Sequence, residues 1–173
     1  MLHSFYEFIL ENNKYKYSNL TFSNTSSLKQ KGDKHKLVLF VDGKEAVVFY
    51  YYLHEPGYYS ETTNKEYDNG LLVDAGAYTS DKYRGNKFLN LCLCHLLLSL
   101  PENCVAQFSV TNENLFDLFY RLGFKDVDVI DYWNKTDNNI ENIIDSNTRK
   151  LIETELKNVE KNFQNPPKRF INY

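Results

Sequence analysis

The sequence of 173 residues predicts an α/β chain of the α+β kind, with a mixed, mostly antiparallel sheet flanked by helices. Three observations predict this class. Two β-rich runs flank an Asp-Gly pair at Asp42-Gly43, a strong local signal for a hairpin. An apolar run over residues 71–79 leads through a polar break into a long helix-compatible stretch. A second strand followed by a second helix is predicted within residues 104–122.

The N-terminal region predicts little regular structure. Phe5 to Leu10 fits a short amphipathic helix behind a possible cap at Ser4. Residues 12–33 are polar and rich in Ser, Thr, Asn and Lys, which favours a loop. Within them, residues 17–22 are the only candidate for a first strand.

The next segment predicts the central strands. Leu37–Val41 and Ala46–Leu53 form the two arms of the hairpin, and residues 56–69 form a loop with Pro, Gly and many polar residues. Carboxylates stand among tyrosines in that loop, which would suit a cationic amine but is also common in solvated loops. Leu71–Thr79 is the central strand.

The second half predicts two further strands and three helices. The helix-compatible stretch ends at Pro101, and Cys104–Val110 is a buried strand. Leu115–Leu122 has apolar residues at helical spacing before a glycine. Val127–Trp133 alternates apolar and acidic residues and predicts a half-exposed final strand.

The C-terminal region predicts a helical extension. A polar linker at residues 134–139 precedes apolar residues that recur at helical spacing over residues 140–159. We therefore divide the chain into a domain at residues 1–133 and an extension at residues 134–173. The apolar stripe predicts that the extension packs on the domain or on a second copy, so a homodimer is possible.

The start of the helix after the central strand is a candidate anion site. The N–H groups of a first helical turn lack partners within the helix, and this end carries about half a positive charge. Arg84 and Lys87 add two cations there. A phosphate would suit this turn, and a solvated basic turn without a ligand is the alternative.

Two segments resemble the GNAT superfamily of N-acetyltransferases. Residues 83–89, Tyr-Arg-Gly-Asn-Lys-Phe-Leu, are similar to its pyrophosphate-binding loop, Arg or Gln-x-x-Gly-x-Gly or Ala. Residues 112–124 are similar to its Asn-rich turn, its helix and its closing Tyr-x-x-x-Gly-Phe. The resemblance covers about residues 36–133. Lys87 and Leu89 stand at the two glycine positions of the family loop, which implies weaker cofactor binding than a full motif gives.

The resemblance implies acetyl-coenzyme A (acetyl-CoA) as the cofactor. Its pantetheine arm would lie between the central strand and the strand that follows, with its pyrophosphate at the loop. The residues implied in cofactor binding are Tyr78, Thr79, Arg84, Gly85, Asn86, Lys87, Phe88, Leu89 and Asn112. Glu113 is the alternative to Asn112, because it has the usual distance from the family tyrosine.

Two residues are candidates for proton transfer. Tyr120 falls at the position of the tyrosine that protonates the leaving thiolate in the family, and a phenol has a suitable pKa near 10. A tyrosine packed at a helix end is the alternative. Asp74 is the only carboxylate within the central strand and could act as general base if burial raised its pKa. A solvated Asp74 is the alternative.

Composition excludes several other classes. The formal charge is −3 and no long Lys/Arg block occurs, which disfavours nucleic acid as a partner. No apolar stretch suits a membrane span, and the start is unlike a signal peptide. The three cysteines and four histidines show no zinc spacing, so we expect no metal. The odd cysteine number favours a reducing compartment, the cytoplasm.

The sequence therefore predicts an acetyl-CoA-dependent N-acetyltransferase that acts on a primary amine, either a small molecule or a peptide. The alternative is a catalytically silent GNAT-like module that works through partner contacts.

Overall fold

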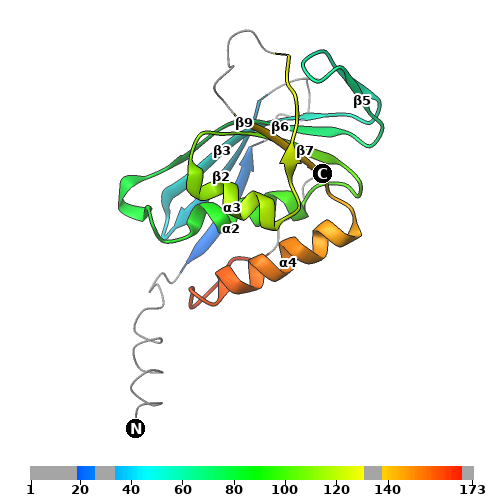
Figure 1. Cartoon of the computed structure of the whole chain (residues 1–173). Helices are drawn as coiled ribbons and strands as arrows, with labels where there is room; N and C mark the ends of the chain where they lie inside the picture. Colours follow the sequence, from blue (N-terminus) through cyan, green and yellow to red (C-terminus); the bar gives the residue numbers. More distant parts are fainter. Residues whose placement is uncertain (1–18, 26–33, 131–137, 169–173) are drawn as a thin grey trace.

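The computed structural model describes residues 19–25, 34–130 and 138–168 (Figure 1). The strands are β1 Leu20–Thr25, β2 His35–Val41, β3 Lys44–His54, β4 Tyr58–Ser60, β5 Lys65–Tyr67, β6 Leu71–Thr79, β7 Val105–Val110, β8 Lys125–Asp126 and β9 Asn138–Ile143. The α-helices are α2 Phe88–Leu98, α3 Glu113–Arg121 and α4 Ser146–Glu160, and a 3₁₀ turn, η1, spans Asp81–Tyr83. The expected helix over residues 5–10 lies outside the described residues.

Seven strands form one sheet in the order β1-β2-β3-β6-β7-β9-β8, and β4 and β5 form a separate hairpin. Every neighbouring pair in the large sheet is antiparallel except β6 and β7, which are parallel. Helix α2 is the crossover that joins this parallel pair. The mixed, mostly antiparallel sheet predicted from the sequence is confirmed.

The β2–β3 hairpin turns where the sequence predicts it. Asp42 and Gly43 both have positive φ, 49° and 80°, as the tight hairpin turn requires. Leu37, Leu39 and Val41 of β2 and Val47, Phe49 and Tyr51 of β3, which alternate along their strands, are buried in the core. The alternation of these strands therefore sets the face on which the core forms.

The core lies between this face and the helices. Helix α2 is apolar on all sides and is buried between the sheet and α4, as the layering in Figure 1 shows. The ring of Phe88 at its start stacks on Phe163, with centroids 5.1 Å apart. Over the other end of the sheet, Phe108 of β7 packs against Phe119 of α3 at 4.8 Å.

Near the C-terminus, the structure differs from the predicted secondary structure in two elements. The strand expected over residues 127–133 is not formed at 127–130: only Lys125 and Asp126 pair with β9. The Ile130 N–H instead donates to the Thr62 carbonyl at 2.6 Å, so this segment leaves the sheet and follows the β4–β5 hairpin. The alternation of apolar and acidic residues predicted a strand here, but at Ile130 the backbone bonds to the turn between β4 and β5 instead of to β9.

The helix expected over residues 140–159 begins only at Ser146. Residues 138–143 are strand β9, which pairs with β7 along its whole length and fully buries Ile140. The spacing of Ile140, Ile143 and Ile144 fits either element, and pairing with β7 selects the strand. The true helix start has a side-chain cap, because the Asp145 carboxylate accepts the Thr148 N–H at 2.8 Å.

Two smaller expectations need adjustment. The expected loop at residues 56–69 contains the β4–β5 hairpin. The candidate strand at residues 17–22 corresponds to β1, which begins at Leu20. No helix in the described part of the chain is long and apolar enough to cross a membrane.

Candidate functional site: the splayed ends of β6 and β7

Strands β6 and β7 pair over only three positions before they part. The parallel pairs are Leu71↔Val105, Leu72↔Ala106 and Val73↔Gln107. Beyond them, β6 continues to Thr79 on its β3 side and β7 continues to Val110 on its β9 side. We call residues 74–79 and 108–110 the β6–β7 splay. Its facing backbone edges have no ladder partner among the described residues, so an extended ligand could pair there.

A bulge in β6 accompanies the splay. Tyr51 of β3 pairs with Asp74 and Phe49 pairs with Ala77, so two residues of β6 stand opposite one of β3. One of the two is Gly76, whose φ is +116°, a backbone conformation that side chains with Cβ rarely adopt. Such a bulge increases the local twist of a strand, and this one follows directly after the last parallel pair.

Asp74 is the first residue of β6 beyond the last parallel pair. It is partly buried, and its Oδ1 accepts the Gly76 N–H at 2.8 Å. Burial raises the pKa of this carboxyl, and the backbone N–H groups of Gly76 and Ser109 partly offset the rise. The carboxyl has a raised pKa at the branch point of the splay, as a general base requires.

The loop after β6 is held at one end by the core. Tyr83 is buried in η1 and contacts Phe88 edge to face, with ring centroids 5.7 Å apart. Gly85 and Lys87 then both have positive φ, 78° and 60°. A Cβ at Gly85 would meet nothing within 4 Å, so this part of the loop faces open space. Lys87 is the N-cap residue of α2 and makes no side-chain cap, which leaves the first N–H groups of the helix to other partners.

Arg84 is exposed in this loop and is tied to it. Its Nε donates to the Thr79 carbonyl at 3.3 Å, and its Nη1 lies 3.1 Å from Asp81 Oδ1. Both side chains of this ion pair are largely exposed, so the pair contributes little to stability. The guanidinium can therefore exchange Asp81 for an external anion at small cost.

The other predicted cofactor residues differ in their accessibility. Tyr78 is 58 % exposed and Thr79 half-buried at the end of β6, and Asn86 lies half-buried in the loop. Leu89 packs against the core, and Phe88 is buried within it. Phe88 can therefore meet a ligand only through its backbone.

Asn112 is the N-cap residue of α3. Its Oδ1 accepts the Asn114 N–H at 3.0 Å, so the side chain caps α3. Glu113 follows as an exposed residue in the first turn.

Tyr120 points to the far edge of the sheet. It is 48 % exposed, and its hydroxyl donates to Asp126 Oδ1 on β8 at 2.9 Å. That hydrogen bond is the main cause of a raised pKa for the phenol. In the sheet order, β9 stands between β8 and β7, so the structure does not bring this hydroxyl to the splay.

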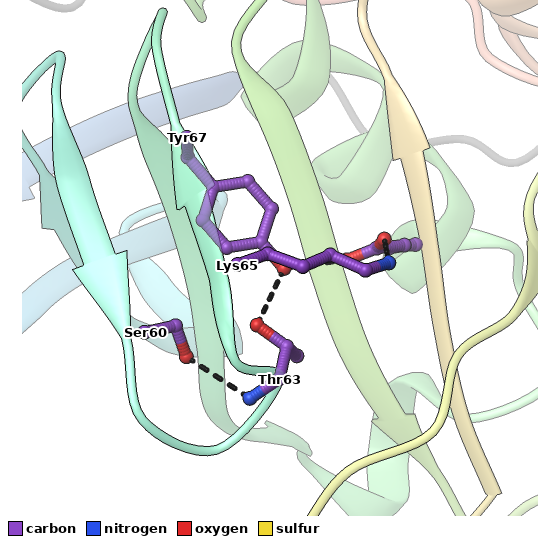
Figure 2. Close-up of polar contacts among 5 residues, drawn as sticks. Ser60, Thr63, Lys65 and Tyr67 are labelled. Carbon is purple, nitrogen blue, oxygen red and sulfur yellow. Dashed lines mark hydrogen bonds and ion pairs between the residues drawn. The ribbon is translucent and has the colours of Figure 1, made fainter.

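A polar cluster, buried at Tyr67 and Thr63 and exposed at Lys65, joins the β4–β5 hairpin to β9 (Figure 2). The Tyr67 hydroxyl lies 2.9 Å from Thr63 Oγ1 and 3.0 Å from Glu141 Oε2, while Lys65 Nζ lies 3.1 Å from Glu141 Oε1. A carboxylate only accepts, so the phenol donates to Glu141 and accepts from Thr63. Burial is the main cause that raises the pKa of Tyr67 to about 12; the Glu141 carboxylate adds to the rise, and the hydrogen bond with Thr63 offsets part of it. The cluster fastens the hairpin to β9.

Gln107 neighbours this cluster and was missed by the sequence interpretation. It is 6 % exposed, and its Nε2 is buried without a hydrogen-bond partner among the described residues. Its signal in the sequence was a polar residue within the apolar run of residues 104–110. No group of three or more possible metal ligands occurs in the part of the chain that the structure describes.

No family model and no curated protein matches the sequence. Solved structures are similar to the fold. BjaI, a CoA-dependent acyl-homoserine lactone synthase solved with MTA, aligns with a TM-score of 0.50 at 7 % identity, over 86 % of this chain and 74 % of that one. The ribosomal-protein-S18-alanine N-acetyltransferase from Escherichia coli aligns with a TM-score of 0.47 at 12 % identity, over 73 % and 95 % of the two chains. A GNAT-family acetyltransferase from Streptococcus pneumoniae gives 0.42 at 14 % identity, over 66 % and 68 %.

Proposed function

Because the chain has a GNAT-like fold, we propose that it transfers an acyl group, acetyl in the first instance, from coenzyme A to a primary amine. Fold likeness at such low identity supports the architecture alone, so the proposal depends on the β6–β7 splay. The observation that carries it is the end of the parallel ladder at Val73↔Gln107, together with the start of α2 after β6, where Lys87 makes no side-chain cap. An extended arm would pair with the splayed edges, and a diphosphate would meet the first turn of α2.

The loop residues fit such a cofactor. Gly85 leaves open space where a Cβ would otherwise obstruct a phosphate, and the left-handed Lys87 turns the chain into α2. The N–H groups of the first turn, Arg84 and Lys87 would together hold the anion. No acidic residue stands in the first turn of α2 to repel it. When bound, coenzyme A would supply the acyl group as a thioester.

Asp74 is our proposed general base. Burial raises the pKa of this carboxyl toward the working pH, which makes its carboxylate form a stronger base toward an ammonium group. Its place at the branch point of the splay puts it beside the end of the paired region, where an amine could approach.

Tyr120 is our proposed proton donor, a role that rests on the sequence resemblance. Its hydroxyl is held by Asp126 on β8, so the role requires that this hydrogen bond break and that the side chain turn toward the splay. Because both groups are exposed, the bond is inexpensive to exchange for another acceptor.

Acetyl-CoA binding tests the proposal. Ligand at 100 times its dissociation constant stabilises a protein by about 2.7 kcal/mol, and about 2–4 °C per kcal/mol is usual at this size. We therefore expect acetyl-CoA to raise the melting temperature by roughly 5–11 °C. Arg84→Ala should remove much of this shift. Asp81→Ala is the matched control: it frees the guanidinium and should preserve or increase the shift.

The alternative is a GNAT-like module without catalysis. The Arg84–Asp81 pair and the side chain at Lys87 favour it, because both occupy the loop that a cofactor would need. Absence of heat in calorimetry and of a thermal shift at millimolar acetyl-CoA would contradict acyl transfer and support this module.

A further inference from the structure

The side-chain amide of Gln107 is a buried donor that the fold leaves unused. Its Nε2 has no partner among the described residues, and Gln107 is more than nine-tenths buried. A buried donor without an acceptor costs about 1–3 kcal/mol. A shape-matched apolar side chain at this position would avoid that cost, so the amide points to a ligand that supplies an acceptor.

Its neighbours do not satisfy it. Glu141 stands directly across from Gln107 in the β7–β9 register, so the two side chains share one face of the sheet. The Glu141 oxygens accept from the Tyr67 hydroxyl and from Lys65, and neither accepts from Gln107 Nε2. On the opposite side, Gln107 is paired with the apolar Val73.

The amide lies next to the candidate reaction site. Val73↔Gln107 is the last parallel pair, so Gln107 stands at the base of the β6–β7 splay. Ser109, two residues further along β7, projects from the same face and is exposed. The amide is therefore one pleat below an open surface.

We propose that Gln107 Nε2 binds a neutral carbonyl oxygen on the acyl acceptor, next to the amine that receives the acyl group. The amide donor selects an oxygen, and the nearby Glu141 carboxylate disfavours an anionic one. The acceptor class is thus a primary amine with an amide carbonyl on the adjacent carbon, as in an amino-acid amide or the first residue of a peptide. The transfer to that amine rests on the proposed function; the binding does not.

An NMR titration of the ¹⁵N-labelled full chain tests this proposal without any turnover. The probes are L-alaninamide, isopropylamine, in which a methyl group replaces the carboxamide, and pantetheine. We expect alaninamide to shift the Gln107 side-chain NH₂ signals and isopropylamine to leave them in place. The Gln107→Met variant identifies these signals by their loss. Ser109→Ala is the matched control on the same face and should keep the alaninamide shift.

Three results would overturn the proposal: equal shifts with alaninamide and isopropylamine, a shift with pantetheine alone, or no shift with any probe. Thermal melting adds a separate readout. Gln107→Met should melt at the wild-type temperature or higher, because it removes an unsatisfied donor. A clear loss of stability without an alaninamide shift would mean that Gln107 holds only a buried structural water. An alaninamide shift without acetyl-CoA binding would leave this subsite standing while the proposed transfer fails.

Discussion

The Tyr67 hydroxyl on β5 and the Glu141 carboxylate on β9 lie 3.0 Å apart, although 74 residues separate them in the chain. This contact fixes the β4–β5 hairpin against the large sheet (Figure 2). Gln107, which pairs with Glu141 in the β7–β9 register, lies on the same face. Stacking of His54 on Tyr58, with ring centroids 3.7 Å apart, holds the base of the same hairpin.

Tyr67→Phe should destabilise the chain by about 1–3 kcal/mol, because Thr63 and Glu141 each lose a buried partner. At roughly 2–4 °C per kcal/mol, the melting temperature should fall by several degrees. Tyr59→Phe, on the exposed strand β4, is the control for loss of a hydroxyl. Equal melting of the two variants would show that the Tyr67 hydroxyl does not fasten the hairpin.

Lys87→Gly should stabilise the loop by up to about 1 kcal/mol, because Lys87 has φ of 60° and ψ of 18°, where a Cβ is strained. Acetyl-CoA binding should be preserved or strengthened, since a glycine lets the backbone approach a phosphate. Urea unfolding and calorimetry measure the two effects. Lys82→Gly, in η1, is the control: φ there suits any residue, so it should destabilise. Weaker binding in Lys87→Gly would show that the lysine charge matters more than backbone freedom.

Tyr120→Phe should lower kcat by about 10²-fold if the phenol is the general acid. Asp126→Ala is the matched variant, because it breaks the same hydrogen bond but keeps the phenol. It should retain activity, with acetyl-CoA affinity unchanged in both. Equal kcat values in the two variants would restrict the hydroxyl to holding α3 against β8.

Asp74→Asn should change stability in a pH-dependent way. Burial raises the folded-state pKa of Asp74, so its protonated form favours the fold below the unfolded pKa, about 3.9, and this contribution is lost as pH rises through the folded pKa. Asparagine keeps the acceptor for the Gly76 N–H and carries no charge. The variant should therefore match or exceed wild-type stability at pH 7, and its advantage should shrink toward pH 4.

Urea unfolding at several pH values measures this difference, and Asp128→Asn, at an exposed site, gives the baseline for losing one negative charge. An advantage that grows on acidification would contradict the sign of the shift. Loss of turnover in Asp74→Asn with unchanged acetyl-CoA affinity is the expected signature of the general base.

Ile152→Ala should cost about 2–5 kcal/mol, because Ile152 is fully buried on the inner face of α4. Leu151→Ala, one residue earlier and 46 % exposed, should change stability by less than about 0.5 kcal/mol. Thermal melting compares the two. This contrast would place α4 within the core; similar small effects in the two variants would show that Ile152 does not anchor α4.

The sequence alone determined the elements whose signals are local. The Asp42-Gly43 turn, the central strand and α2 depend on turn chemistry, strand composition and length, and each is formed where it was predicted. The left-handed position at Lys87 was also predictable, because a glycine belongs at that point of the resembled loop.

Only the tertiary structure decided the elements and contacts whose causes lie far apart in the chain. Residues 138–143 become a strand because β7 offers an unpaired edge, and isoleucine spacing cannot report that edge. Gln107 stands opposite Glu141 because the sheet order places β9 beside β7. The Tyr120 hydroxyl donates to Asp126 because β8 forms the edge beyond β9. Side-chain partners of this kind depend on strand order and register, which long-range packing sets and local sequence does not.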